Sequence, residues 1–133
     1  MPAKRAPKPD RFSAAIAAAA DQAKIIGIKA GRAPHRTIGV WVVVVEGRIF
    51  IRSWSQKPRS WWRTFLEEPE GVLELAGRKL RVRAVQTRSE RLKDAVSRAY
   101  MEKYGQGGSV RYARDLGRPK SRETTTKLRP LTY

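Results

Sequence analysis

Residues 40–52, with the sequence Val-Trp-Val-Val-Val-Val-Glu-Gly-Arg-Ile-Phe-Ile-Arg, decide the fold of this chain. Two runs rich in β-branched and aromatic residues flank Glu46-Gly47, a pair that suits a tight turn between antiparallel strands. The stretch therefore predicts a β-hairpin. Its first arm is apolar at every position from 40 to 45, which is typical of a strand covered on both faces, at the centre of a sheet or in a barrel wall.

A second hairpin is predicted over residues 72–86, with strands at 72–76 and 79–86 and a turn at Gly77-Arg78. Its second strand alternates, with Leu80, Val82 and Ala84 on one face and Arg81 and Arg83 on the other. One face is therefore expected in the core and the other in water. Large apolar residues of the two hairpins should be buried, namely Trp41, Val43, Phe50 and Leu80.

Three helices are expected around these hairpins. The first starts at a cap provided by Asp10 and runs toward Ala23, and the second spans residues 60–68. The third runs from a Ser89 cap to Tyr104, where glycines follow. Further strands are expected at residues 25–28 and within 123–133, the latter laid on a sheet edge, and residues 31–36 are expected to form a loop.

Strands mostly in hairpin order with short helices between them predict a mainly β (α+β) fold, a small, twisted antiparallel barrel. The length of 133 residues suits one domain, which we place at residues 10–133. Residues 1–9 contain three prolines and the cations Lys4, Arg5 and Lys8, so we expect them to form a disordered basic arm.

Composition excludes several classes of protein. The chain has no cysteine and a single histidine, His35, so disulfides, thiol chemistry and a histidine-rich metal site are ruled out, and no metal is expected. No apolar run approaches the roughly 18 residues of a membrane span. The alanine-rich residues 13–20 superficially look like a signal peptide, but Asp10, Arg11 and Asp21 interrupt the pattern. A cytoplasmic location is therefore expected.

The net charge of +17, from 29 basic and 12 acidic residues, implies anionic partners. Such a surface binds nucleic acid loosely at low salt whatever its biological role, and we expect this binding to be non-specific. The sharper signal is residues 52–63, which place four cations, three hydroxyls and three indoles between a strand end and a helix start. An anion site is predicted there from five residues: Arg52, Ser53, Lys57, Arg59 and Ser60.

Alternative interpretations stay open for these residues. Trp61 is equally suited to the core, and the cations to a solvated loop. Tyr100 and Tyr104 share a helix face, either as core residues or as the lining of a groove. The adjacent glutamates 67, 68 and 70 do not suit a catalytic dyad, and no catalytic residue is identified.

The order of motifs resembles a bacterial family known as domain of unknown function 2255, over roughly residues 12–131. The resemblance rests on Trp41-Val42-Val43-Val44, Ile49-Phe50-Ile51-Arg52-Ser53, Trp61-Trp62-Arg63, the hairpin at 72–84, Ala99-Tyr100-Met101-Glu102-Lys103-Tyr104 and Thr126-Lys127-Leu128-Arg129-Pro130. More distantly the chain is similar to deazaflavin-dependent nitroreductases and pyridoxamine-phosphate-oxidase-like flavin proteins. That similarity implies a split β-barrel of the FMN-binding type with short flanking helices.

In those flavin proteins the loop after the third strand holds the cofactor phosphate, and the ring lies along the barrel wall. The resemblance implies phosphate-side positions at Arg52, Ser53, Lys57, Ser60 and Trp61, with Arg63 beside them. Where many of these proteins have a glycine, this chain has Ser55-Gln56-Lys57, so loss of the cofactor is an alternative.

The leading hypothesis is a cytoplasmic split-barrel protein that binds a phosphorylated small molecule, flavin mononucleotide (FMN) or a deazaflavin, for hydride transfer. One alternative is a basic nucleic-acid-binding module in which Trp54, Trp61, Trp62 or Tyr112 stacks on bases. Another is an interaction domain without a ligand. A homodimer is compatible with the leading hypothesis, because barrels of this type place their site within one subunit or across two.

Overall fold

The computed structural model describes residues 11–32 and 36–131. The expected basic arm, the proposed cap Asp10 and His35 lie outside the described residues.

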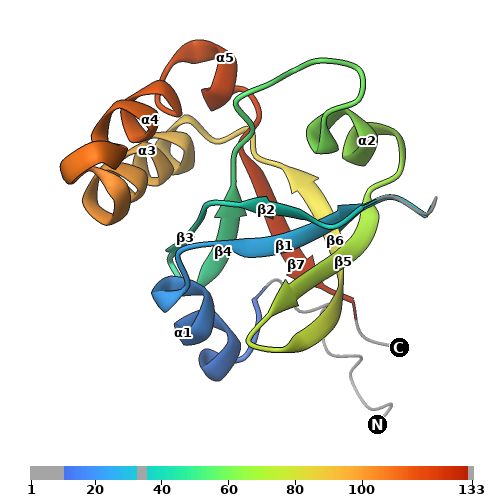
Figure 1. The fold of residues 1–133 in the computed structure, drawn as a ribbon. Coiled ribbons are helices and arrows are strands. Elements are labelled where there is room, and N and C mark those ends of the chain that lie inside the picture. Colours follow the sequence, from blue (N-terminus) through green and yellow to red (C-terminus); the bar gives the residue numbers. More distant parts are fainter. Residues whose placement is uncertain (1–10, 33–35, 132–133) are drawn as a thin grey trace, which may run out of the picture.

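Seven antiparallel strands form a nearly closed barrel (Figure 1). They are β1 (Ile26–Ala30), β2 (Ile38–Val40), β3 (Val42–Val45), β4 (Arg48–Ile51), β5 (Glu70–Leu75), β6 (Arg78–Gln86) and β7 (Thr126–Pro130), in the sheet order β2-β1-β5-β6-β7-β4-β3. The two ends of this order, β2 and β3, are separated in the chain by Trp41 alone. One bent segment thus pairs with β1 before Trp41 and with β4 after it, which curls the sheet into a barrel. The predicted α+β split barrel is confirmed.

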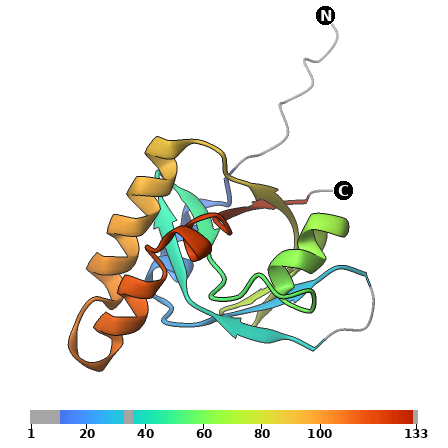
Figure 2. The ribbon, with the colours of Figure 1, turned by 90° about the horizontal axis from the view of Figure 1, so that it is seen from above.

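Helices surround the barrel. They are α1 (Ala14–Gln22), α2 (Trp61–Glu67), α3 (Glu90–Tyr104), the 3₁₀ turn η1 (Gly107–Ser109), α4 (Val110–Asp115) and α5 (Pro119–Arg122). Helices α3 and α4 lie side by side on one side of the barrel, and α2 lies on the opposite side (Figures 1 and 2). The sequence did not predict the helices between residues 107 and 122, because this segment is rich in glycine and arginine and has no clear apolar period.

Both predicted hairpins form. The first turns at Glu46 and Gly47, both with positive φ (54° and 76°), as a two-residue type I′ turn requires. The second turns at Ala76 and Gly77 (53° and 73°), one residue earlier than predicted. A glycine at the second turn position places Arg78 in β6, where it pairs with Leu75.

The last strand is not on a sheet edge, contrary to the prediction. Strand β7 lies between β4 and β6, and Lys127 pairs with Phe50 on one side and with Val85 on the other. Because β7 supplies backbone partners to both hairpins, it joins them into one sheet. Its inward side chains, Thr126 and Leu128, are fully buried.

The barrel interior forms the main core. Alternate residues of the strands point inward, including Ile28, Ile49, Leu73 and Val82, all completely buried. Helix α1 adds Ile16 and Ala20 to this core, and α2 adds Trp61 and Phe65. Serine side chains cap α1, α2 and α3. In α1 the cap is Ser13, whose Oγ accepts from the amide of Ile16, and not the predicted Asp10.

A second core lies outside the barrel, between β3–β4 and the helices α3 and α4. It contains Val43 and Phe50 from the strands, and Val96, Tyr100, Tyr104, Ala113 and Leu116 from the helices. The first arm of the decisive hairpin is therefore covered on both faces, as predicted, although β3 lies at an end of the sheet order. Val43 and Phe50 are buried as expected, whereas Trp41 at the strand bend and Leu80 near a hairpin turn are only half-buried.

Candidate functional site

Arg52 directly follows β4 and is the centre of a buried hydrogen-bond network. Its side chain is 2% exposed. Its guanidinium donates to Thr125 Oγ1, Ser97 Oγ, and the carbonyl oxygens of Leu116 and Lys93, each at 2.8 Å. Desolvation lowers the pKa of Arg52 to about 10, so it stays charged at neutral pH. The donors point into the protein, and Arg52 therefore supports the loop after β4 and is not available to an external phosphate.

Ser53 also serves the loop internally. Its amide donates to Thr124 Oγ1 at 2.8 Å, and its hydroxyl donates to the carbonyl of Ser55 at 2.7 Å. Further along, Gln56 Nε2 donates to the carbonyl of Lys120, and Arg63 Nε donates to the carbonyl of Gln56. The loop is thus fixed to β7, α5 and α2 by its own polar groups.

The other predicted site residues surround the start of α2. Lys57 and Arg59 are exposed, and Ser60 Oγ caps the helix by accepting from the amide of Arg63. The Arg63 guanidinium lies 5.4 Å from the ring centre of Trp62. Trp61 packs into the barrel core and is 7% exposed. Its ring meets that of Phe65 edge-on, with the ring centres 6.1 Å apart. Of the seven residues predicted for the site, Arg59 and Trp61 line a common cavity.

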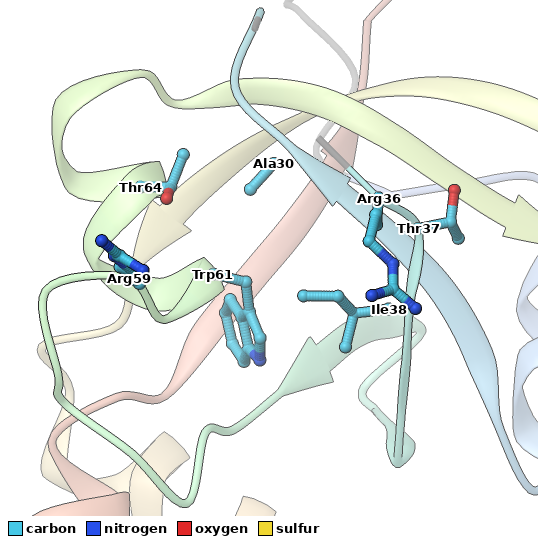
Figure 3. A pocket seen from close by; sticks show the side chains of 7 residues that line it. All are labelled: Ala30, Arg36, Thr37, Ile38, Arg59, Trp61 and Thr64. Atoms are coloured by element: carbon cyan, nitrogen blue, oxygen red, sulfur yellow. The ribbon is translucent and has the colours of Figure 1, made fainter. Parts of the chain in front are cut away.

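That cavity has a volume of about 540 Å³ and lies between β1, β2 and the start of α2 (Figure 3). Ala30 comes from the end of β1, and Arg36, Thr37 and Ile38 come from the approach to β2 and its first residue. Arg59, Trp61 and Thr64 complete the lining from the other side. In Figure 3 the indole of Trp61 lies between Arg59 and the pair Arg36 and Ile38.

The cavity carries positive charge that the described residues do not neutralise. Within residues 11–32 and 36–131, neither Arg36 nor Arg59 forms an ion pair with a carboxylate. The two threonine hydroxyls already donate internally, Thr37 to Glu74 Oε2 at 3.0 Å and Thr64 to the carbonyl of Ser60 at 3.3 Å. The two guanidinium groups remain as charged donors in the lining, beside the indole of Trp61 and the apolar Ile38 and Ala30.

Sequence reasoning missed Arg36, Thr37 and Ile38, which lie more than 20 residues before Arg59 in the chain. The available signal was the basic loop at residues 31–36, but nothing local connects it to the loop after β4. The pairing of β1 with β2, which brings Ile38 opposite Ile28, makes that connection.

The Ala-Tyr-x-x-Lys-Tyr motif contributes both of its tyrosines to the second core. Tyr100 is completely buried and donates to the carbonyl of Trp41 at 3.1 Å. Tyr104 donates to the carbonyl of Lys24 at 2.7 Å and accepts from the amide of Val42 at 3.0 Å. Burial raises the pKa of both tyrosines. The core interpretation of this pair is therefore the one supported.

Lys103 links three elements. Its ammonium group donates to the carbonyl oxygens of Ala20, at the end of α1, and Val42, in β3, at 3.1 and 2.8 Å. Desolvation lowers the pKa of Lys103.

The glutamates near α2 also have partners within the protein. Glu70 pairs with Arg81 and Arg83 at 3.5 and 3.8 Å, and Glu68 accepts a hydrogen bond from the amide of Arg32.

Two further observations concern only the described residues. No three of their histidine, aspartate or glutamate side chains come together in a way that could hold a metal ion. None of their helices is long and apolar enough to cross a membrane.

Comparison with known proteins agrees with this architecture. A family model described as "Uncharacterized protein conserved in bacteria (DUF2255)" matches residues 14–128, so the chain belongs to this family. No curated protein matches the sequence.

A solved structure shares the fold. The crystal structure of conserved hypothetical protein Rv2991 from Mycobacterium tuberculosis aligns with a TM-score of 0.56 and 13% sequence identity, over 98% of this chain and 86% of the other. At that identity the likeness concerns the fold alone.

Proposed function

We propose that the β1–β2–α2 cavity binds a phosphorylated flavin or deazaflavin, FMN being the simplest, and that the protein has an oxidoreductase-like activity. The observation that carries the proposal is the placement of Arg36 and Arg59 around the indole of Trp61. A cytoplasmic location, expected from the sequence, belongs to this proposal, and a homodimer is compatible with it.

The phosphate would be held by the two arginines. Guanidinium groups bind phosphate through charge-assisted, often bidentate hydrogen bonds. Arg36 and Arg59 have no carboxylate partner among the described residues, so a phosphate would not have to displace one. Lys57, exposed in the same loop, would add to the local positive potential without lining the cavity.

The ring would lie against Ile38 and the small part of Trp61 that faces the cavity, since the rest of this side chain is buried in the barrel core. Trp61 is held by its packing on Phe65, so its orientation is fixed before a ligand arrives. A cavity of about 540 Å³ falls in the usual range for cofactor sites, roughly 300–1,000 Å³. The combination of two cations, an indole and an aliphatic side chain fits a ligand with one anionic end and one flat end.

When bound, such a cofactor supplies hydride transfer, and the protein supplies binding and orientation. Arg36 and Arg59 would bind the phosphate, and Trp61 would orient the ring. Arg52 and Ser53 would act one step away, by holding the loop that carries Arg59.

The proposal is tested by titrating FMN and riboflavin, which differ only in the phosphate, into the wild type and into the double variant Arg36→Ala/Arg59→Ala. We expect the double variant to bind FMN at least about 10-fold more weakly, since each charge-assisted bond contributes about 1.5–3 kcal/mol. Its affinity for riboflavin should stay within about 2-fold of wild type. Equal FMN affinity in both proteins would remove this cavity from the site.

The control removes two cations elsewhere. Arg78 and Lys79 are exposed at the second hairpin turn, so Arg78→Ala/Lys79→Ala matches the charge change without touching the cavity. An equal loss of FMN affinity in this control would mean that net charge, and not the cavity, attracts the cofactor.

A further inference from the structure

A run of aromatic side chains reaches the surface away from the cavity. Trp54 and Tyr112 are 41% and 47% exposed, which is unusual for such large aromatic groups. Their ring centres are 6.4 Å apart with the planes nearly perpendicular, at 84°. Behind Trp54 lies the half-buried Trp41, at 5.3 Å and 72°. We call Trp41, Trp54 and Tyr112 the aromatic platform.

The platform is built on a fixed base. Trp41 stacks flat on the buried Tyr104, at 4.1 Å and 3°, and Tyr104 is held by hydrogen bonds to Lys24 and Val42. The backbone on either side of Trp54 is fixed by the Ser53–Thr124 and Ser55–Ser53 bonds. A rigid aromatic surface loses little conformational entropy when a flat ligand stacks on it.

One cation contacts the platform: the Arg111 guanidinium lies 5.5 Å from the ring centre of Tyr112. Two more belong to segments next to Trp54. Lys57 is exposed three residues after Trp54 in the chain, and the backbone carbonyl of Lys120 accepts a hydrogen bond from Gln56 of the same loop. Within the part of the chain that the structure describes, none of these three cations forms an ion pair.

We propose that the aromatic platform is a binding site for single-stranded nucleic acid, with bases stacking on Trp54 and Tyr112 and phosphates lying along the flanking cations. The partner must combine flat rings with repeated negative charge, and single-stranded DNA and RNA have both. An acidic peptide would satisfy the charge but would leave the exposed rings without a stacking partner. The net charge of +17 adds long-range attraction to this local arrangement.

The structure also changes which tryptophans are suited to stacking. Trp61 is buried in the barrel core. Trp62 is half-buried, donates its indole N–H to Gln86 Oε1 at 2.8 Å, and is covered by Arg63. Of the four aromatic residues considered from sequence, Trp54 and Tyr112 are therefore the two that offer open rings.

The test compares two strands of equal charge. Oligothymidylate of about 12 nucleotides and an abasic strand of the same length are each titrated against the whole protein at about 0.15 M salt. Both strands release similar numbers of counterions, so a difference in affinity reports base contacts. We expect oligothymidylate to bind at least about 5-fold more tightly, and Trp54→Ala to remove most of that preference.

Three variants complete the design. Trp54→Phe keeps a flat ring and should retain the preference, and Tyr112→Ala, on the surface of α4, should reduce it even if Trp54→Ala proves unstable. Leu66→Ala removes an exposed apolar side chain from α2 and should leave it unchanged. An oligouridylate arm shows whether RNA is favoured over DNA.

Equal affinity of the wild type for the two strands would overturn the proposal and leave only charge. So would a preference that survives in both Trp54→Ala and Tyr112→Ala. The platform does not share residues with the cavity, so these results are independent of the FMN titrations.

Discussion

The guanidinium of Arg52, directly after β4, donates a hydrogen bond of 2.8 Å to the hydroxyl of Thr125, directly before β7. The same guanidinium reaches α3 and the end of α4, so one side chain ties the last strand and the outer helices to the barrel. Removal of the Arg52 side chain would take the guanidinium donor away from four acceptors and leave a cavity next to them.

The first prediction concerns this network. Arg52→Ala should lower the free energy of unfolding by about 3 kcal/mol or more, because it leaves several buried acceptors unpaired. Arg52→Lys keeps the charge but cannot reach all four acceptors, so it should lie between the alanine variant and wild type. Urea unfolding at neutral pH measures both. Arg78→Ala, at an exposed turn, is the control and should change stability by no more than about 0.5 kcal/mol. An Arg52→Ala loss no larger than that of the control would show that the network is not needed for folding.

A second prediction concerns Phe50, the centre of the second core. The side chain is completely buried between β4 and α3, so Phe50→Ala should cost about 3–5 kcal/mol through the cavity that it leaves. Denaturant titration checks the value. A loss below about 1 kcal/mol would contradict the packing of α3 on the decisive hairpin.

A third prediction concerns Gly71, at the start of β5. A Cβ at this position would collide with the carbonyl oxygen of Lys29 and would lie 2.9 Å from Cε1 of Phe65. Gly71→Ala should therefore destabilise the protein by about 1–3 kcal/mol, the usual cost of overpacking. Gly108→Ala is the matched control, since nothing lies within 4 Å of a Cβ there. Thermal unfolding that separates the two variants would support the close approach of α2 to β1 and β5, and identical melting would contradict it.

The fourth prediction concerns pH. Burial raises the pKa of Tyr100 above its ordinary value of 10, so the folded state holds this proton more tightly than the unfolded state. The stability that Tyr100 contributes is therefore fully present below about pH 10 and is lost as the pH rises further. Tyr100→Phe cannot ionise and lacks this dependence. Urea titrations across pH 8–12 should show the advantage of wild type over Tyr100→Phe shrinking above about pH 10. A constant difference would contradict the burial of the Tyr100 hydroxyl.

The sequence was informative where structure is local. Both hairpins followed from two short runs and a glycine-containing turn, and the Ser89 cap was predicted from the chain. The position of β7 was not, because a strand cannot show from its own residues whether it closes a sheet or ends it. Its central place follows from the two pairings of Lys127, with Phe50 and with Val85, which lie 77 and 42 positions earlier in the chain.

Only part of the candidate site was predicted, again because long-range contacts are not visible in the local sequence. An arginine at the end of a strand looks like an exposed ligand, and the burial of Arg52 depends on acceptors 41 to 73 residues away. Arg59 and Trp61 were found from composition, but Arg36 joins them only through the pairing of β1 with β2. The predicted loop thus supplies part of the cavity, and a distant segment supplies the rest.

The central claim, that the β1–β2–α2 cavity holds a phosphorylated flavin-type ring, is tested most directly by one absorption measurement. The whole protein is incubated with FMN, or with a phosphorylated deazaflavin in parallel, and passed through a desalting column. We expect the visible absorption of the ring to stay with the wild-type protein in near-stoichiometric amount and to be lost from Arg36→Ala/Arg59→Ala. A wild-type protein that emerges colourless from both incubations would contradict the binding of a flavin-type ring in this cavity.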